Sequence, residues 1–424
     1  MGVETALGVE HDPFADLIEP FSRRGVDLGL DRLQAALAEL GNPERRFAAV
    51  QVAGTNGKGS ICTLVHQALL ASDIHAGLYT SPHLVSWTER IRLGDTPIAS
   101  PDLRRHLETA TPIAQRHQLT PFELVTAAAF LAFAEANCEL VVLEVGLGGR
   151  LDATTCHPHR PVIGFASVGL DHAEFLGPDP ATIAAEKAGV LQPGAVAISA
   201  PQSPEVAAVL VERAAAMGAE LRWVEALDLN QWTLGLSGAV QAANGAVALG
   251  LLQALRERGW PVNDPAIRRG FAAARWPGRL QQLSWGGQPL LLDGAHNLPA
   301  ALALRAELDA HPERHGLASG PRHWLLGMLA NKQGPEIATA LLAPGDRAWI
   351  VPVPGHACWS LEALTAACPR LASQLRSAPS LEAGLAQAGS GLQRVVVAGS
   401  LYLLGQVAPS WQAPAASPGT SDFG

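Results

Sequence analysis

Short apolar runs and longer segments with helical periodicity alternate along most of the chain. The apolar runs predict strands at residues 47–52, 75–79, 140–144, 162–168, 195–199, 290–293, 323–327, 348–353 and 394–398. The periodic segments predict helices at residues 59–71, 103–117, 126–136, 180–188, 240–258 and 299–308. Strands that alternate with helices are typical of a parallel sheet built from βα units, so the predicted fold class is α/β.

A break in this pattern predicts two domains. Residues 275–280 (RWPGRL) and 285–287 (WGG) place proline and glycine before a new strand. We therefore expect one α/β domain over residues 1–285 and a smaller one over residues 286–410. Residues 411–424 have little to bury, and we expect them to form a disordered tail.

Composition excludes several classes of protein. The 424 residues are 48% hydrophobic, which is enough for one large core or two ordinary ones. Only 16% of residues are charged and the net charge is −9, so we expect no nucleic-acid partner. No uninterrupted apolar window of about 18 residues is present, which argues against a membrane span.

The N-terminal residues and the cysteine pattern indicate the expected cellular compartment. The first residues are acidic and no basic region leads into an apolar stretch, so we expect no secretory signal and a cytoplasmic protein. The five cysteines are scattered and lack paired spacing. They therefore predict free, mostly buried thiols rather than a disulfide framework or a zinc site.

A glycine-rich loop carries the strongest chemical signal. Residues 52–60 (VAGTNGKGS) follow a predicted strand and open a helix, which is the setting of a phosphate-binding loop. Lys58 would reach the β- and γ-phosphates, and Ser60 would touch a magnesium ion or a phosphate oxygen. The spacing departs from the usual pattern because Gly59 separates the lysine from the hydroxyl. The alternative is a glycine-rich turn with a solvated lysine.

Two further strands deliver polar residues to the same predicted sheet edge. Glu144 ends the strand at residues 140–144, where a carboxylate beside a phosphate-binding loop suits a metal. His172 follows the next strand and is a candidate for a metal or a phosphate. A lone strand-end glutamate is otherwise an ordinary surface group. Lys187, one residue before the end of a predicted helix, reads by itself as a favourable C-terminal charge.

The second predicted domain contributes the loop at residues 293–297 (DGAHN), which would hold a ribose or an amino-acid head group. Asn297 has an alternative role as a helix N-cap. Arg279, near the predicted boundary, is placed to reach nucleotide phosphates.

Nine short strings in order then resemble one family. They are residues 27–32 (DLGLDR), 53–60 (AGTNGKGS), 80–84 (TSPHL), 144–153 (EVGLGGRLDA), 186–189 (EKAG), 276–279 (WPGR), 293–297 (DGAHN), 327–330 (GMLA) and 399–402 (GSLY). Together they resemble the folylpolyglutamate synthase and dihydrofolate synthase branch of the Mur-ligase superfamily. The resemblance implies a P-loop domain followed by a Rossmann-like domain. It also implies ATP and Mg²⁺, and amide formation between a folate-type carboxylate and L-glutamate through an acyl phosphate.

The resemblance also assigns roles to individual residues. The nucleotide would be held by Thr55, Asn56, Gly57, Lys58, Gly59, Ser60, Asn244, Arg279 and Asp293. Mg²⁺ ligands would be Ser81, Glu144, His172 and a carbamylated Lys187, and the catalytic group would be Lys58, Glu144, His172 and Lys187. The substrate would be bound by Asp27, Leu28, Thr120, Phe122, Glu123, Leu151, Asp152, Ala153 and His296. Phe122 would stack on a flat heterocycle, although a core phenylalanine is an equally good description.

The acceptor is expected to be dihydropteroate, a folyl glutamate, or both, and the chain is expected to be a monomer. Residues 331–333 (NKQ) carry amides where the family often has aspartates. A Mur-type cell-wall ligase is the rival within the superfamily. A P-loop ATPase or switch without an acyl acceptor is the rival from another class. The ligase reading expects the P-loop, Glu144 and the 293–297 loop to surround one magnesium–triphosphate.

Overall fold

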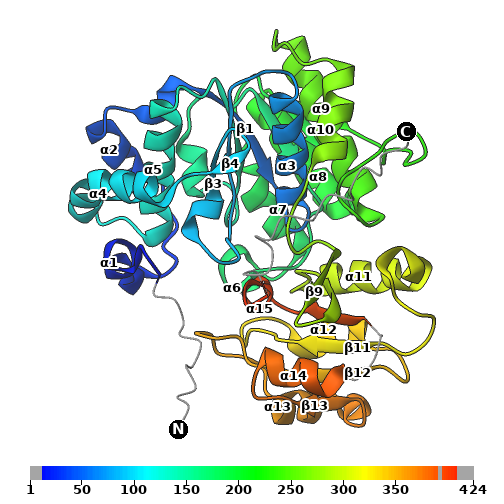
Figure 1. The fold of residues 1–424 in the computed structure, drawn as a ribbon. Helices are drawn as coiled ribbons and strands as arrows, with labels where there is room; N and C mark the ends of the chain where they lie inside the picture. Colours follow the sequence, from blue (N-terminus) through cyan, green and yellow to red (C-terminus); the bar gives the residue numbers. More distant parts are fainter. Residues whose placement is uncertain (1–11, 390–393, 408–424) are drawn as a thin grey trace, which may run out of the picture. The chain divides into compact units, whose positions relative to one another are not determined.

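The computed structural model describes residues 12–389 and 394–407, and the chain divides into two compact units, Met1–Trp276 and Pro277–Gly424. Each unit has a mostly parallel sheet with helices packed on it (Figure 1), which confirms the α/β prediction. The division falls before the predicted boundary at residue 285, because strand β9 (Gln281–Trp285) pairs with the second sheet. The predicted tail at residues 411–424 lies outside the described residues.

The sheet of the first unit has the strand order β4-β3-β2-β5-β1-β6-β7-β8. Only β3 and β4 at one edge run antiparallel to their neighbours. The strands are β1 (Ala48–Ala53), β2 (Ala76–Tyr79), β3 (Ile91–Leu93), β4 (Thr96–Pro97), β5 (Leu140–Glu144), β6 (Val162–Phe165), β7 (Val196–Ser199) and β8 (Glu220–Trp223). The buried side chains of β1, β5 and β6 explain why these central strands appear as mostly apolar runs in the sequence, with Gln51 and Glu144 as the exceptions.

Helices cover both faces of this sheet. The helices are α1 (Ala15–Ile18), α2 (Asp31–Glu39), α3 (Lys58–Leu70), α4 (Ser100–His117), α5 (Pro121–Glu135), α6 (Ala173–Leu176), α7 (Pro180–Ala188), α8 (Pro204–Met217), α9 (Val240–Glu257) and α10 (Asp264–Ala273). Alternation along β1 sends Val50 and Val52 to a core with α3, α9 and α10, and Ala49 to a core with α2, α4 and α5. In Figure 1, α3 and α10 lie side by side, in agreement with their packing.

The second unit is a six-stranded sheet in the order β13-β12-β11-β14-β10-β9, with only β9 antiparallel. Its remaining strands are β10 (Gln288–Leu292), β11 (His323–Leu326), β12 (Arg347–Ile350), β13 (Leu375–Ser377) and β14 (Val395–Ala398). Its helices are α11 (Leu298–Ala310), α12 (Gly334–Leu341), α13 (Leu361–Ala367), α14 (Leu381–Ala388) and α15 (Leu401–Gly405). Its core centres on Trp324, which is fully buried.

Two predictions about the whole chain can be compared with these coordinates. Within the described residues, no helix combines the length and the apolar content that a bilayer span requires. All five cysteines are free thiols, as predicted, and four of them are buried while Cys358 is partly exposed.

Candidate active site

Strand β1 delivers the glycine-rich loop to the start of α3, as the sequence predicted. Gly54 and Gly57 have φ values of +142° and +96°, which favour glycine. A Cβ atom at Gly57 would lie 2.3 Å from Asn244 Oδ1, and one at Gly59 would lie 2.8 Å from Trp276 Nε1. The loop therefore needs its glycines both for backbone conformation and for close packing.

Contacts within and around the loop hold it closed. Lys58 Nζ donates hydrogen bonds to the carbonyl oxygens of Gly54 and Thr55, both at 3.1 Å. The Thr55 hydroxyl lies 3.0 Å from both the nitrogen and the oxygen of Gly169. The loop after β1 is thus tied to the loop after β6, and the Lys58 ammonium lies over the loop backbone.

Helix α9 brings a second polar group to the loop. Asn244 Nδ2 donates to Gln241 Oε1 at 3.0 Å, and Gln241 Nε2 donates to the Ser60 hydroxyl at 3.4 Å. Asn244 was expected at the nucleotide, whereas Gln241 was not. Its position three residues before Asn244, on the same helix face, is the signal that could have identified it.

Glu144 ends β5, the strand beside β1, and is buried. Its Oε2 atom accepts a hydrogen bond from the backbone nitrogen of Ser81 at 3.2 Å. Two of the expected metal ligands are therefore adjacent. Among the described residues, no group of three or more His, Cys, Asp or Glu side chains is placed to hold a metal by itself.

Lys187 lies in the last turn of α7, as its sequence position suggested, and it is buried. Burial, together with the nearby Lys58 ammonium, lowers the pKa of Lys187 to about 7. Asp171 and Asp152 act in the opposite direction. The amine is therefore close to half neutral near pH 7, which suits reaction at nitrogen.

His172 is the N-cap of α6 and has a φ of +53°. Its Nε2 atom lies 3.9 Å from Asp171 Oδ2, and its backbone nitrogen donates to Asp171 Oδ1 at 2.9 Å. His172 belongs to the same loop that contacts Thr55 through Gly169. His172 therefore lies three residues after the glycine that hydrogen-bonds to the phosphate-binding loop.

The glycine run after β5 is organised by Asp152. Its Oδ2 atom accepts from the backbone nitrogens of Gly146 and Leu147 at 3.0 and 2.9 Å, and its Oδ1 atom accepts from the nitrogen and hydroxyl of Thr154. Burial raises the pKa of Asp152, and these hydrogen bonds oppose that effect. The carboxylate therefore holds the loop together.

Phe122 packs on this loop. A Cβ atom at Gly146 would lie 2.6 Å from its Cζ atom, and its ring centroid lies 6.1 Å from that of Tyr79. Phe122 is only partly buried. Phe122 therefore packs against the core, which is one of the two descriptions considered from the sequence, and the residue remains partly exposed.

The other expected substrate residues divide into two sets. Thr120 and Glu123 form a capping box at the start of α5, and Arg32 joins Glu123 to Asp27 with ion pairs of 3.3 and 2.9 Å. These three expected residues therefore have structural partners. Leu28 and Leu151 are half-buried and Ala153 is buried.

In the second unit, Asp293 follows β10 and fixes the loop around it. Its carboxylate oxygens accept from the backbone nitrogens of Leu280 and Ala295, both at 3.0 Å. Burial raises the pKa of Asp293, and the Arg279 guanidinium opposes this shift. His296 Nδ1 lies 2.7 Å from the Gly294 oxygen, and both Arg279 and His296 lie close enough to Asp293 to influence its pKa, so the three residues form one cluster. Asn297 caps α11, as its alternative reading proposed.

A buried polar group under the first site was not anticipated. Gln51, in the middle of β1, donates to the hydroxyls of Thr154 and Thr155 at 2.8 and 2.9 Å. It accepts from Arg160, which is buried and also donates to the Val190 carbonyl at 3.1 Å. A lone amide within an apolar strand is the sequence signal for such a group.

The comparisons with known proteins agree with this arrangement. Residues 279–409 match the family model described as "Dihydrofolate synthetase, C-terminal domain". The chain is 33% identical to the dihydrofolate synthetase of Saccharomyces cerevisiae, over 76% of this chain and 80% of that protein. It is 34% identical to the dihydrofolate synthase/folylpolyglutamate synthase of Escherichia coli, over 74% of this chain and 75% of that protein.

Solved structures give the same result. The Mycobacterium tuberculosis folylpolyglutamate synthase complexed with ADP and AMPPCP has a TM-score of 0.84 at 27% identity, covering 96% of this chain and all of that one. The bifunctional folylpolyglutamate synthase/dihydrofolate synthase with Mn, AMPPNP and L-glutamate bound has a TM-score of 0.82 at 29% identity. The match covers 95% of this chain and 98% of that one. On this similarity in sequence and structure, the chain belongs to the family of dihydrofolate synthases and folylpolyglutamate synthases.

Proposed function

We propose that this chain, an ATP-dependent ligase by family, joins L-glutamate to the carboxylate of dihydropteroate, of a folyl glutamate, or of both. The observation that carries the proposal is the single sheet edge shared by the glycine loop, Glu144, Ser81 and Lys187. The related Escherichia coli enzyme is described in complex with DHPP and ADP, and the bifunctional folylpolyglutamate synthase/dihydrofolate synthase with L-glutamate bound. The ligands of these relatives fit the chemistry of this edge.

The reaction needs an activated acceptor. A carboxylate is a poor electrophile, so one of its oxygens attacks the γ-phosphorus of ATP and ADP leaves. The glutamate amine then attacks the acyl carbon of the mixed anhydride, and phosphate leaves with that oxygen. Lys58 and the loop nitrogens would hold the charge on the phosphates while the phosphoryl group moves.

The residues present fit a divalent cation of the Mg²⁺ type. Ser81 and Glu144 supply oxygen ligands, and Mg²⁺ in nucleotide sites commonly takes one or two protein carboxylates together with substrate phosphates. His172 and Lys187 would complete the expected set. When bound, the cation would neutralise charge on the transferred phosphoryl oxygens.

We infer that Lys187 is carbamylated in the active enzyme. Carbamate formation requires a neutral amine that attacks CO₂ and loses a proton, and burial already lowers the pKa of Lys187 to about 7. The product is a carboxylate on a long arm, which suits a metal site. Activity that survives Lys187→Ala unchanged, with no added bicarbonate, would contradict this inference.

The choice of acceptor is tested by the mass of the products. The chain is incubated with ATP, Mg²⁺ and L-glutamate, and with either dihydropteroate or tetrahydrofolate as the acceptor. A mass gain of one glutamyl residue on dihydropteroate identifies a dihydrofolate synthase, and one or more on tetrahydrofolate identify a folylpolyglutamate synthase. No gain on either acceptor would overturn the proposal.

Measurement of ADP release distinguishes the proposed ligase from the rival ATPase. A ligase releases ADP only when acceptor and glutamate are both present, whereas an ATPase or switch is indifferent to them. The Mur-type rival requires a UDP-linked muramyl acceptor and predicts no turnover with a pterin acid. A monomeric state and a cytoplasmic location remain part of the proposal.

A further inference from the structure

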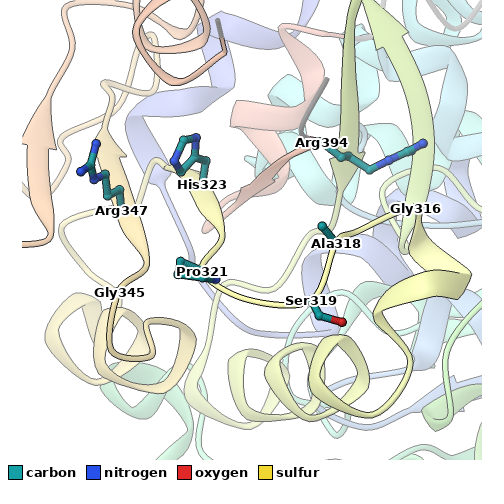
Figure 2. Close-up of a pocket in the computed structure, with 8 residues that line it drawn as sticks. All are labelled: Gly316, Ala318, Ser319, Pro321, His323, Gly345, Arg347 and Arg394. Atoms are coloured by element: carbon teal, nitrogen blue, oxygen red, sulfur yellow. The ribbon is translucent and has the colours of Figure 1, made fainter. Parts of the chain in front are cut away.

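A cavity of about 780 Å³ opens at the amino-terminal edge of the second sheet. It is lined by Gly316, Ala318, Ser319, Pro321, His323, Gly345, Arg347 and Arg394 (Figure 2). Its volume is within the range of about 300–1,000 Å³ that is usual for small-molecule sites. The Asp293 loop follows the carboxyl end of β10, so this cavity lies at the opposite edge of the same sheet.

Three basic residues stand at the starts of three adjacent strands. His323 begins β11, Arg347 begins β12, and Arg394 immediately precedes β14. His323 and Arg347 are partners in the strand register, so they share one face of the sheet. Figure 2 shows Arg347 and Arg394 on opposite sides of the opening, with His323 between them.

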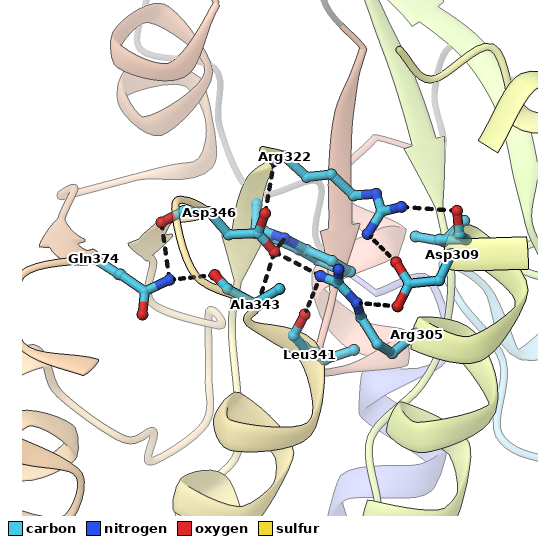
Figure 3. A network of polar contacts seen from close by, with 9 residues as sticks. Arg305, Asp309, Arg322, Leu341, Ala343, Asp346 and Gln374 are labelled. Carbon is cyan, nitrogen blue, oxygen red and sulfur yellow. Dashed lines mark hydrogen bonds and ion pairs between the residues drawn. The ribbon is translucent and has the colours of Figure 1, made fainter. Parts of the chain in front are cut away.

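The carboxylates next to these residues are engaged elsewhere. Asp346 precedes Arg347, but it is buried and accepts from Arg305 and from the Arg322 backbone at 2.6 and 2.8 Å. Arg322 precedes His323 and pairs with Asp309 at 2.7 Å. Figure 3 shows this network, which fixes the loops before β11 and β12. No Asp or Glu is among the described residues that line the cavity.

The cavity cations therefore lack acidic partners. No described residue forms an ion pair with Arg347 or Arg394. The Nε atom of Arg394 is buried without a hydrogen-bond partner in the described structure, and its Nη1 atom donates only to the Leu290 carbonyl at 3.1 Å. Partial burial lowers the pKa of Arg394, so an anion nearby would be favoured.

Neutral groups in the cavity also suit an oxyanion. Gly316 has a φ of +62°, and a Cβ atom there would lie 2.9 Å from Arg394 Nη2, so glycine lets the guanidinium approach the backbone. His323 Nδ1 donates to the Ala388 carbonyl at 2.8 Å, so Nε2 donates to an oxyanion only when the ring is protonated. Ser319 adds a hydroxyl at the rim.

We propose that this cavity is a second ligand site, which binds a multivalent oxyanion between Arg347 and Arg394, away from the loop that carries Asp293. The ligand chemistry is a chain or cluster of phosphate or carboxylate groups, long enough to reach both guanidinium groups. The proposal is independent of the proposed ligase reaction, because it concerns binding at the other edge of the second sheet.

The test is calorimetric titration of the full chain with its nucleotide site saturated by ADP and Mg²⁺. One arm uses inorganic pyrophosphate and the other uses tri-γ-glutamate, which separates a phosphate source from a carboxylate source. We expect one site per chain for at least one probe, and binding about tenfold weaker in Arg347→Gln. Arg394→Lys, which keeps the charge but loses Nε, should weaken binding as well.

The matched control is Arg46→Gln, which removes an exposed arginine of the first unit and should leave binding unchanged. The proposal is overturned if neither probe binds the ADP-loaded chain. It is also overturned if Arg347→Gln binds like the unmodified chain, or no more weakly than Arg46→Gln. Because no turnover is measured, failure here leaves the ligase proposal untouched.

Discussion

Glycine at position 57 is required by its surroundings as well as by its φ of +96°. We expect Gly57→Ala to lower the free energy of unfolding by about 1–3 kcal/mol, because the new methyl group meets Asn244 in a strained backbone. It should also abolish ADP binding. Chemical denaturation and ADP titration measure the two effects. Gly94→Ala is the control, since its φ is also positive but no atom lies within 4 Å of a Cβ there.

Lys187 is one of three lysines in the chain, with Lys58 and Lys332. This scarcity makes its modification easy to assign by ¹³C NMR after exchange with ¹³C-bicarbonate. We expect one carbamate signal near pH 8. The signal should decline as the pH falls below about 7, because protonation of the amine removes the nucleophile.

Lys187→Met should remove that signal, whereas Lys332→Met should leave it in place. A spectrum that is the same in Lys187→Met and in the unmodified chain would refute carbamylation at this residue. The prediction concerns a single side chain, because the proposed carbamate would form on the same buried amine whose pKa is lowered.

At the scale of elements, Thr120 and Glu123 start helix α5. Their capping box satisfies backbone nitrogens at the helix N-terminus, with Thr120 Oγ1 accepting from the Glu123 nitrogen at 3.2 Å. We expect Thr120→Ala to destabilise the fold by about 1 kcal/mol, as loss of a cap usually does. Thermal unfolding measures this change. Thr120→Ser should restore the stability, and an unchanged melting temperature in Thr120→Ala would contradict the capping role.

The Gln51 network links β1 to both ends of the glycine run. Gln51 holds Thr154, which donates to Asp152, and Thr155, which donates to the Gly149 carbonyl at 2.7 Å. We expect Gln51→Leu to raise the KM for the pterin acceptor several-fold more than the KM for ATP. It should also cost about 1–3 kcal/mol of stability, because the buried Arg160 guanidinium loses an acceptor and the two threonine hydroxyls lose a donor.

Steady-state kinetics with each substrate varied in turn give this comparison. The control is Gln67→Leu, which makes the same change at a partly exposed helix position whose amide contacts Asp95. Equal increases in both KM values for Gln51→Leu would indicate a general structural defect, and would contradict a positioning role toward the acceptor.

The sequence predicts strands that have a continuous apolar pattern, and it does not reveal short strands whose formation depends on pairing with a neighbouring strand. The buried central strands, such as β5, stand out because four apolar residues in a row precede the terminal Glu144. The edge strands β4 and β8, and β3 next to β4, were missed because they are short and partly exposed. Strand β9 alternates between half-buried and exposed residues and follows a proline–glycine turn, which led to the late domain boundary.

For the candidate site, the sequence indicates which residues stand at the ends of strands but does not indicate which side chains are buried. Residues at the ends of parallel strands, such as Lys58 and Glu144, can be located from local patterns alone. Burial cannot be read in this way, because it depends on elements far away in the sequence. The burial of Lys187 and the Gln51–Arg160 contact therefore became visible only in the folded structure.

At the scale of the whole molecule, the account rests on one chemical claim, which is that ATP activates a carboxylate. If an acyl phosphate forms, one carboxylate oxygen must leave in inorganic phosphate. The most direct measurement uses dihydropteroate or tetrahydrofolate with an ¹⁸O-labelled carboxylate, ATP, Mg²⁺ and L-glutamate, with mass analysis of the phosphate released. The account predicts one ¹⁸O atom in each phosphate. Amide product accompanied by unlabelled phosphate would contradict it. Phosphate release in the absence of both the pterin acceptor and L-glutamate would contradict it as well.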